Sequence, residues 1–117
     1  MIRRDGPVVQ KSMAFSISLI KYCDLLFERK KFIISNQLLK SGISIGASIF
    51  EAQYADSRLD FIHKMKIAQK EANEAMYWLI LCEKIEQINI QDELIINLNE
   101  ILAILSKIIT TSKKNLN

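Results

Sequence analysis

The side chains that could do chemistry are few: acids that pair along a helix, one histidine and two cysteines. Glu71 and Glu74 are three residues apart, which places both carboxylates on one face of a helix. A dinuclear carboxylate site in a helical bundle also needs a histidine three residues after a glutamate on two of its helices. Neither acid has a histidine at that step, and His63 stands alone. We therefore predict no metal site and expect His63 to be exposed or to make a polar contact.

The two cysteines, Cys23 and Cys82, each fall inside an apolar helical pattern, far apart in the chain. They lack the close spacing of zinc ligands, so we expect two reduced, buried thiols in a cytoplasmic protein. No histidine can be placed beside a serine nucleophile from the sequence. Gly42 and Gly46 lie within a helical pattern and not after a strand, which argues against a nucleotide-binding fingerprint. These observations predict a protein that is not an enzyme and that uses no cofactor.

Cations gather at two places, although the net charge of +3, from 16 basic and 13 acidic residues, is too small to require a polyanionic partner. Arg29, Lys30 and Lys31 follow one another between two helical patterns, and Lys40 lies further along. We take these four as candidate nucleic-acid contacts, because a basic cluster can bind phosphate backbones without sequence specificity. A second cluster would form at the opposite end of a bundle, from Arg3, Arg4, Arg58, Lys113 and Lys114. The alternative is that both clusters are simply solvated turns and termini.

A stripe that mixes acids with a large aromatic residue contains Glu71, Glu74 and Trp78. An exposed tryptophan beside charged groups is typical of an interface, so we predict an oligomer or partner contact here. The alternative places Trp78 in the core and pairs the acids with lysines, for example Lys70 with Glu74. Glu51 joins the candidate interface because an acid in an otherwise uncharged stretch must find a partner or face solvent.

Four long helical segments must position these residues. The 117 residues are 50% hydrophobic and include one proline and three glycines, too few turn residues for many short strands. We predict one all-α domain over residues 1–117, with helices at about 7–27, 33–54, 58–85 and 91–112. Ser57 and Asp60 have the spacing of a helix cap. Short breaks favour a left-handed up-down-up-down four-helix bundle. From the sequence we expect charge to interrupt the apolar runs before the ~18 residues that a membrane span needs, and no signal peptide is indicated.

Apolar residues at alternating steps of four and three mark the seams of this bundle. In the second segment, Gly42 on the seam would admit a bulky side chain from a neighbour. The seams are Leu38, Gly42, Ile45, Ile49 and Ala52; Phe61, Met65, Ala68, Ala72, Ala75, Leu79 and Cys82; and Leu94, Leu98, Ile101, Leu105 and Ile108. The apolar arcs of the first, second and fourth segments are wider than a four-helix core can bury, so we predict a homo-oligomer.

The run from Ser41 to Lys84 resembles the signature of the bacterial four helix bundle protein family, which is encoded in intervening sequences of large-subunit ribosomal RNA genes and elsewhere. The resembling elements are residues 48–52, the Ser57-x-x-Asp60-Phe61 start of the third segment, and residues 68–79, with Trp78 near the end. In many members residues 48–52 read Asn-Ile-Ala-Glu-Gly, and this chain differs at three of these positions.

The resemblance implies a pentameric ring of four-helix subunits whose function in the family is unknown. The accessory protein of diversity-generating retroelements is similar, and it is a basic pentamer that binds nucleic acid and a reverse transcriptase. We therefore expect a non-catalytic cytoplasmic homo-oligomer that contacts nucleic acid, RNA in preference to DNA, and no membrane. The alternative is a protein-interaction scaffold or accessory subunit that binds no nucleic acid.

Overall fold

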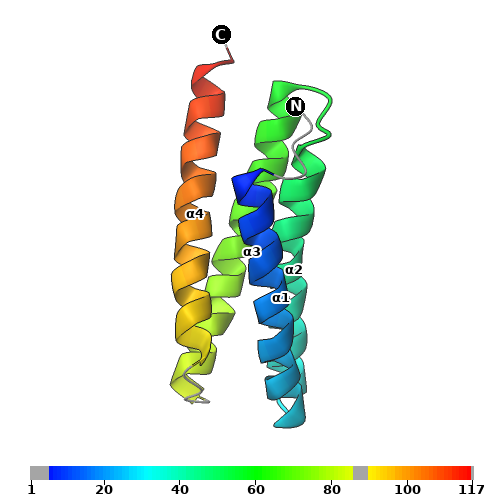
Figure 1. Ribbon diagram of the computed structural model, residues 1–117, viewed down its shortest axis with the longest axis vertical. Helices are drawn as coiled ribbons and strands as arrows, with labels where there is room; N and C mark the ends of the chain where they lie inside the picture. The colour runs from blue at the N-terminus through cyan, green and yellow to red at the C-terminus, as the bar shows by residue number, and fades with distance from the viewer. Residues whose placement is uncertain (1–5, 86–89, 117) are drawn as a thin grey trace.

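The computed structural model describes residues 6–85 and 90–116, and the regular elements in these ranges are all helices. The helices are α1 (Pro7–Glu28), α2 (Phe32–Ala52), α3 (Arg58–Ile85) and α4 (Ile90–Lys114). Figure 1 shows them side by side along one long axis, with successive helices running in opposite directions. The molecule measures 50 × 21 × 20 Å. The predicted all-α class is confirmed, and the helices begin and end within two residues of the expected limits.

The core lies between helices that are neighbours in sequence, because α1 packs on α2, α2 on α3 and α3 on α4, while α4 closes on α1. The seams predicted for α2 and α3 are buried along their whole length. On α4 the prediction holds through Leu105, but Ile109 and then Ser112 continue the buried face, and Ile108 is only partly buried. On α1 the buried side is Phe15, Leu19, Tyr22 and Leu26, whereas the other apolar side points to solvent.

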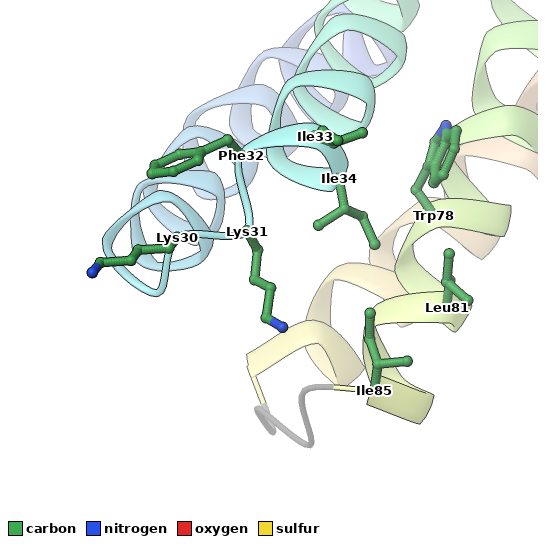
Figure 2. Close-up of a pocket in the computed structure, with 8 residues that line it drawn as sticks. All are labelled: Lys30, Lys31, Phe32, Ile33, Ile34, Trp78, Leu81 and Ile85. Atoms are coloured by element: carbon green, nitrogen blue, oxygen red, sulfur yellow. The ribbon is translucent and has the colours of Figure 1, made fainter.

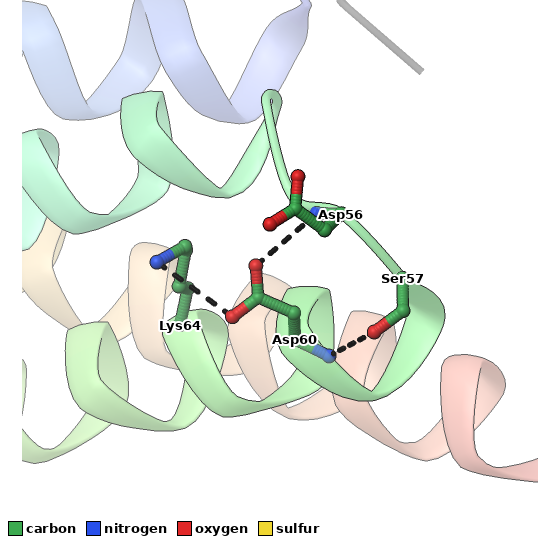
Figure 3. A network of polar contacts seen from close by, with 4 residues as sticks. All are labelled: Asp56, Ser57, Asp60 and Lys64. Atoms are coloured by element: carbon green, nitrogen blue, oxygen red, sulfur yellow. Dashed lines mark hydrogen bonds and ion pairs between the residues drawn. The ribbon is translucent and has the colours of Figure 1, made fainter.

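Local sequence explains where two of the helices begin. Pro7 occupies the first turn of α1, where its missing N–H costs no hydrogen bond. At α3 the Ser57 hydroxyl accepts a hydrogen bond from the backbone N–H of Asp60, at 3.1 Å. The Asp60 carboxylate in turn accepts from the backbone N–H of Asp56, at 3.2 Å, and lies 3.7 Å from the Lys64 ammonium (Figure 3). The predicted cap between Ser57 and Asp60 is therefore formed. The backbone N–H that donates back to the Asp60 carboxylate is that of Asp56 and not that of Ser57.

The apolar run of α4 is longer than the sequence interpretation allowed. By length and composition, Asp92–Lys114 could cross a membrane, although only 28% of its most apolar window is buried in the bundle. Polar contacts join this helix to its neighbours: Glu100 pairs with Lys11 of α1, and the Gln69 amide of α3 donates to the Ser106 hydroxyl at 3.1 Å. These contacts and the buried Leu98 are those of a helix packed in a bundle.

Candidate functional site

The predicted nucleic-acid contacts do not form one cluster. Arg29, Lys30 and Lys31 are exposed together in the turn between α1 and α2. Lys40 is also exposed, but it lies eight residues beyond Phe32, the first residue of α2, which is about 12 Å along the helix. The structure therefore brings three of the four cations together and leaves Lys40 apart from them.

Lys30 has a backbone conformation that lysine rarely adopts. Its φ angle is 65°, the one positive φ among the non-glycine residues that the structure describes. The Lys30 N–H donates to the Phe27 carbonyl and the Lys31 N–H to the Leu26 carbonyl, both at 2.9 Å. These two bonds are those of a Schellman motif, in which glycine usually occupies the left-handed position. Lys30 therefore occupies a position at which glycine would make the folded chain more stable.

Trp78 lies in a groove between the start of α2 and the end of α3, which we call the Trp78 groove. Its volume is about 440 Å³, and its lining is mainly apolar: Lys30, Lys31, Phe32, Ile33, Ile34, Trp78, Leu81 and Ile85. Figure 2 shows Ile33 and Ile34 across from Trp78, with Lys30 directed away from them. The indole N–H of Trp78 is buried and has no acceptor among the described residues. A buried donor without an acceptor costs about 1–3 kcal/mol.

The predicted interface residues divide between two places, because Glu71 and Glu74 precede Trp78 on one face of α3, whereas Glu51 lies on α2. Glu71 is partly buried and Glu74 exposed on α3, and Lys70 does not pair with Glu74 among the ion pairs of the described residues. Glu51 is exposed and follows Ile34 of the groove by 17 residues on α2, or about 25 Å. Glu51 therefore lies apart from the other three residues, and the Lys70–Glu74 pair of the alternative is absent from the described part of the chain.

A continuous apolar surface lies on α1 and α2, and we call it the α1–α2 surface. It consists of two stripes of exposed side chains at helical spacing: Met13, Ile17, Ile20 and Phe27 on α1, and Phe32, Ile43, Phe50 and Tyr54 on or just beyond α2. Met13, Ile17 and Phe27 are 53%, 52% and 54% exposed. The rings of Phe27 and Phe32 meet edge to face, 4.7 Å apart, so the stripes join at the turn. The sequence signal for this surface was the excess width of the apolar arcs.

The second basic cluster can be described only in part, because Arg3 and Arg4 lie outside the described residues. Arg58, Lys113 and Lys114 are exposed where α3 begins and α4 ends. Hydrogen bonding to Lys66, together with like-charge repulsion from that side chain, lowers the pKa of Lys113. Lys66 was not among the predicted site residues, since only the packing of α3 on α4 places it beside Lys113.

No group of three or more potential metal ligands occurs among the residues that the structure describes. Cys23 and Cys82 are buried, as expected, and form no disulfide among the described residues. Burial raises the pKa of the Cys23 thiol to about 12, and a hydrogen bond with Ser35 opposes this only in part. His63 is exposed. Thiols in this environment are poor nucleophiles.

Comparisons with known proteins extend over most of the chain. A family model described as 23S rRNA-intervening sequence protein matches residues 4–110. A crystal structure from Bacteroides thetaiotaomicron VPI-5482, of a protein of unknown function from the S23 ribosomal protein family, superposes with a TM-score of 0.83. The two chains are 43% identical, over 87% of this chain and 97% of the other. No curated protein matches the chain.

Proposed function

Since the chain belongs to the 23S rRNA-intervening sequence protein family, we propose that it is a non-catalytic cytoplasmic protein whose copies assemble into a ring that contacts nucleic acid. Each copy would be a left-handed up-down-up-down bundle, and the ring would be a pentamer. The function of the solved relative is unknown. The proposal therefore depends on the surfaces of this chain.

The observation that carries self-assembly is the α1–α2 surface. A soluble monomer seldom exposes an apolar patch that spans two whole helices. Ile17 lies in the middle of the α1 stripe, and Phe50 lies near the end of the α2 stripe. The stripe residues next to them are uncharged. In a ring, each copy would present this surface to a different surface of the next copy, because cyclic assemblies above a dimer use head-to-tail contacts.

The basic turn supports nucleic-acid contact. Arg29, Lys30 and Lys31 would be repeated at each subunit, and five copies at +3 each carry a net charge of +15. A ring of such turns would attract phosphate backbones without reading their sequence. Lys40 is further along α2 and would contribute only to a ligand that follows this helix.

Sedimentation velocity tests the assembly. The wild-type protein should sediment as one species near five times 13.5 kDa, and Ile17→Glu or Phe50→Glu should give a folded monomer. Ile96→Glu is the matched control, because Ile96 is 60% exposed on α4, outside the α1–α2 surface. A monomeric wild type, or equal loss of mass in the control, would reject this interface.

Gel-shift titration with single-stranded RNA at low salt tests the proposed contact with nucleic acid. Changing Arg29, Lys30 and Lys31 to Gln should weaken binding at least tenfold. The control changes three exposed lysines elsewhere, Lys21, Lys70 and Lys84, and should retain most of the affinity. Absence of binding by the wild-type protein would reject the nucleic-acid role and leave the assembly role standing.

The unpartnered indole of Trp78 favours a second candidate, a scaffold that binds another protein or the neighbouring subunit through the Trp78 groove. A carbonyl on the partner would accept from the indole N–H, which has no acceptor within the described residues. Trp78→Phe keeps the aromatic ring and removes the donor. It should lower the assembled or partner-bound mass without lowering the stability of the isolated chain. Unchanged mass with Trp78→Phe and with Glu71→Lys would count against this candidate.

A further inference from the structure

A second cleft lies at the opposite end of the bundle from the basic turn, where α3 begins and α4 ends. It is lined by two cations, two hydroxyl groups and two apolar side chains: Arg58, Lys107, Thr111, Ser112, Phe61 and Ile108. We call it the Arg58 cleft. Its volume is about 460 Å³, within the range of small-molecule sites in proteins. No acidic residue lines it among the described part of the chain.

The polar groups of this cleft are donors without acceptors. Ser112 is only 7% exposed, and its hydroxyl forms no hydrogen bond within the described residues. Arg58 and Lys107 likewise have no ion pair in the described ranges. Asp60, the nearest acid along α3, is already engaged by Lys64 and by the backbone N–H of Asp56. The cleft therefore offers hydrogen-bond donors of both charged and neutral type to an outside acceptor.

Two features raise the positive potential around these donors. Lys113 and Lys66 lie side by side on the neighbouring faces of α4 and α3, close enough that Lys66 lowers the pKa of Lys113. The cleft also includes Arg58, the first residue of α3, where the positive end of the helix dipole lies. Ser57 accepts from the N–H groups of Asp60 and Phe61, so the earliest amide groups of α3 are left for solvent or a ligand.

We propose that the Arg58 cleft binds a phosphate group. Arg58 and Lys107 would neutralise its charge, and the hydroxyls of Thr111 and Ser112 would donate to its oxygens. A phosphate monoester carries about −1.5 to −2 charge and presents oxygens in several directions, which suits two cations and two hydroxyls arriving from different helices. A carboxylate is planar and would be satisfied by one arginine. This inference does not depend on the ring or on the basic turn.

Equilibrium dialysis with radiolabelled inorganic phosphate, in chloride buffer at constant ionic strength, tests the site. The wild-type protein should bind phosphate saturably, with one site per chain. The double variant Arg58→Gln/Lys107→Gln should bind at least tenfold more weakly, and Ser112→Ala, which removes one small donor, several-fold more weakly. The matched control Lys21→Gln/Lys84→Gln removes the same charge at two exposed positions outside the cleft and should bind like the wild type. Circular dichroism would verify that each variant is folded.

The results separate this site from general attraction of anions. Non-saturable uptake, or equal loss in the Lys21/Lys84 control, would overturn the proposal. Competition with RNA oligomers then identifies the source of the phosphate. A 5′-phosphorylated oligomer that displaces phosphate better than its 5′-hydroxyl counterpart indicates a monoester, whereas equal displacement indicates the backbone diester. If neither oligomer displaces phosphate from a saturable site, the ligand is a small phosphate compound.

Discussion

Leu19 of α1 packs directly on the bare backbone of Gly42 in α2, so that a Cβ atom added to Gly42 would overlap the Leu19 Cδ2 atom. Both residues are buried. The missing side chain lets α1 and α2 approach closely, and Leu19 acts as a knob in the hole that Gly42 leaves. The position of Gly42 on the predicted α2 seam anticipated this arrangement, which the structure confirms.

Gly42→Ala should destabilise the protein by about 1–3 kcal/mol, because overpacking outweighs the roughly 1 kcal/mol gain in helix propensity. Gly46→Ala is the matched control. A Cβ there would lie 3.3 Å from Ser16 Oγ and 3.7 Å from the nearest atoms of Ser12, so a small adjustment accommodates it. Urea denaturation should show a lower midpoint for Gly42→Ala only. Equal effects at both glycines would mean that Leu19 does not set the helix separation.

Removing the α3 cap should cost about 1 kcal/mol, as loss of an N-cap hydroxyl generally does. Ser57→Ala leaves the Asp60 N–H without the hydroxyl oxygen that now lies 3.1 Å away. The control is Ser44→Ala, because the Ser44 hydroxyl only bonds back to the Lys40 carbonyl of its own helix, a contact that adds little. Thermal unfolding followed by circular dichroism would compare the two. A Tm for Ser57→Ala equal to that of Ser44→Ala would contradict the capping role.

Stability should fall at alkaline pH through Cys23. Its pKa is raised from 9.0 to about 12 in the folded chain because the thiol is buried, so above pH 9 the unfolded state loses this proton first. The stabilisation is complete below pH 9 and is lost as pH rises toward 12. Cys23→Ala should therefore show a shallower decline of unfolding free energy between pH 8 and 11. The native thiol should also react with a disulfide reagent far more slowly than in denaturant; equally fast reaction would mean that it is accessible.

The seams were predictable because a fixed step of four and three residues identifies one face of a helix without any knowledge of its neighbours. For α3, this spacing alone predicted the buried residues from Phe61 to Cys82. On α4 the last seam residue was wrong, because the heptad step placed it at Ile108, whereas a helix with 3.6 residues per turn also accommodates a further step of four. The buried face therefore passes from Leu105 to Ile109 and Ser112, and Ile108 is left at its edge.

The candidate sites were less predictable because each depends on how two helices are offset along their axes. Arg58 and Lys107 are 49 residues apart in sequence and meet only because α4 runs back beside α3. Glu51 and Trp78 were predicted to belong to one interface, but they lie near opposite ends of the packed α2–α3 pair. Neither the amino-acid composition nor the spacing of apolar residues along one helix says how far that helix is shifted along its neighbour.

Lys30→Gly should stabilise the fold and weaken function at once. Glycine tolerates the φ of 65° at this position, so the substitution should add about 1 kcal/mol of stability, visible as a higher urea midpoint. It also removes one cation from the basic turn, and RNA affinity at low salt should fall. Lys30→Ala removes the same charge but keeps the backbone strain, so it should lose affinity with no gain in stability. If both variants bind RNA like the wild type, Lys30 does not contact nucleic acid; if glycine adds no stability, the left-handed conformation is not strained.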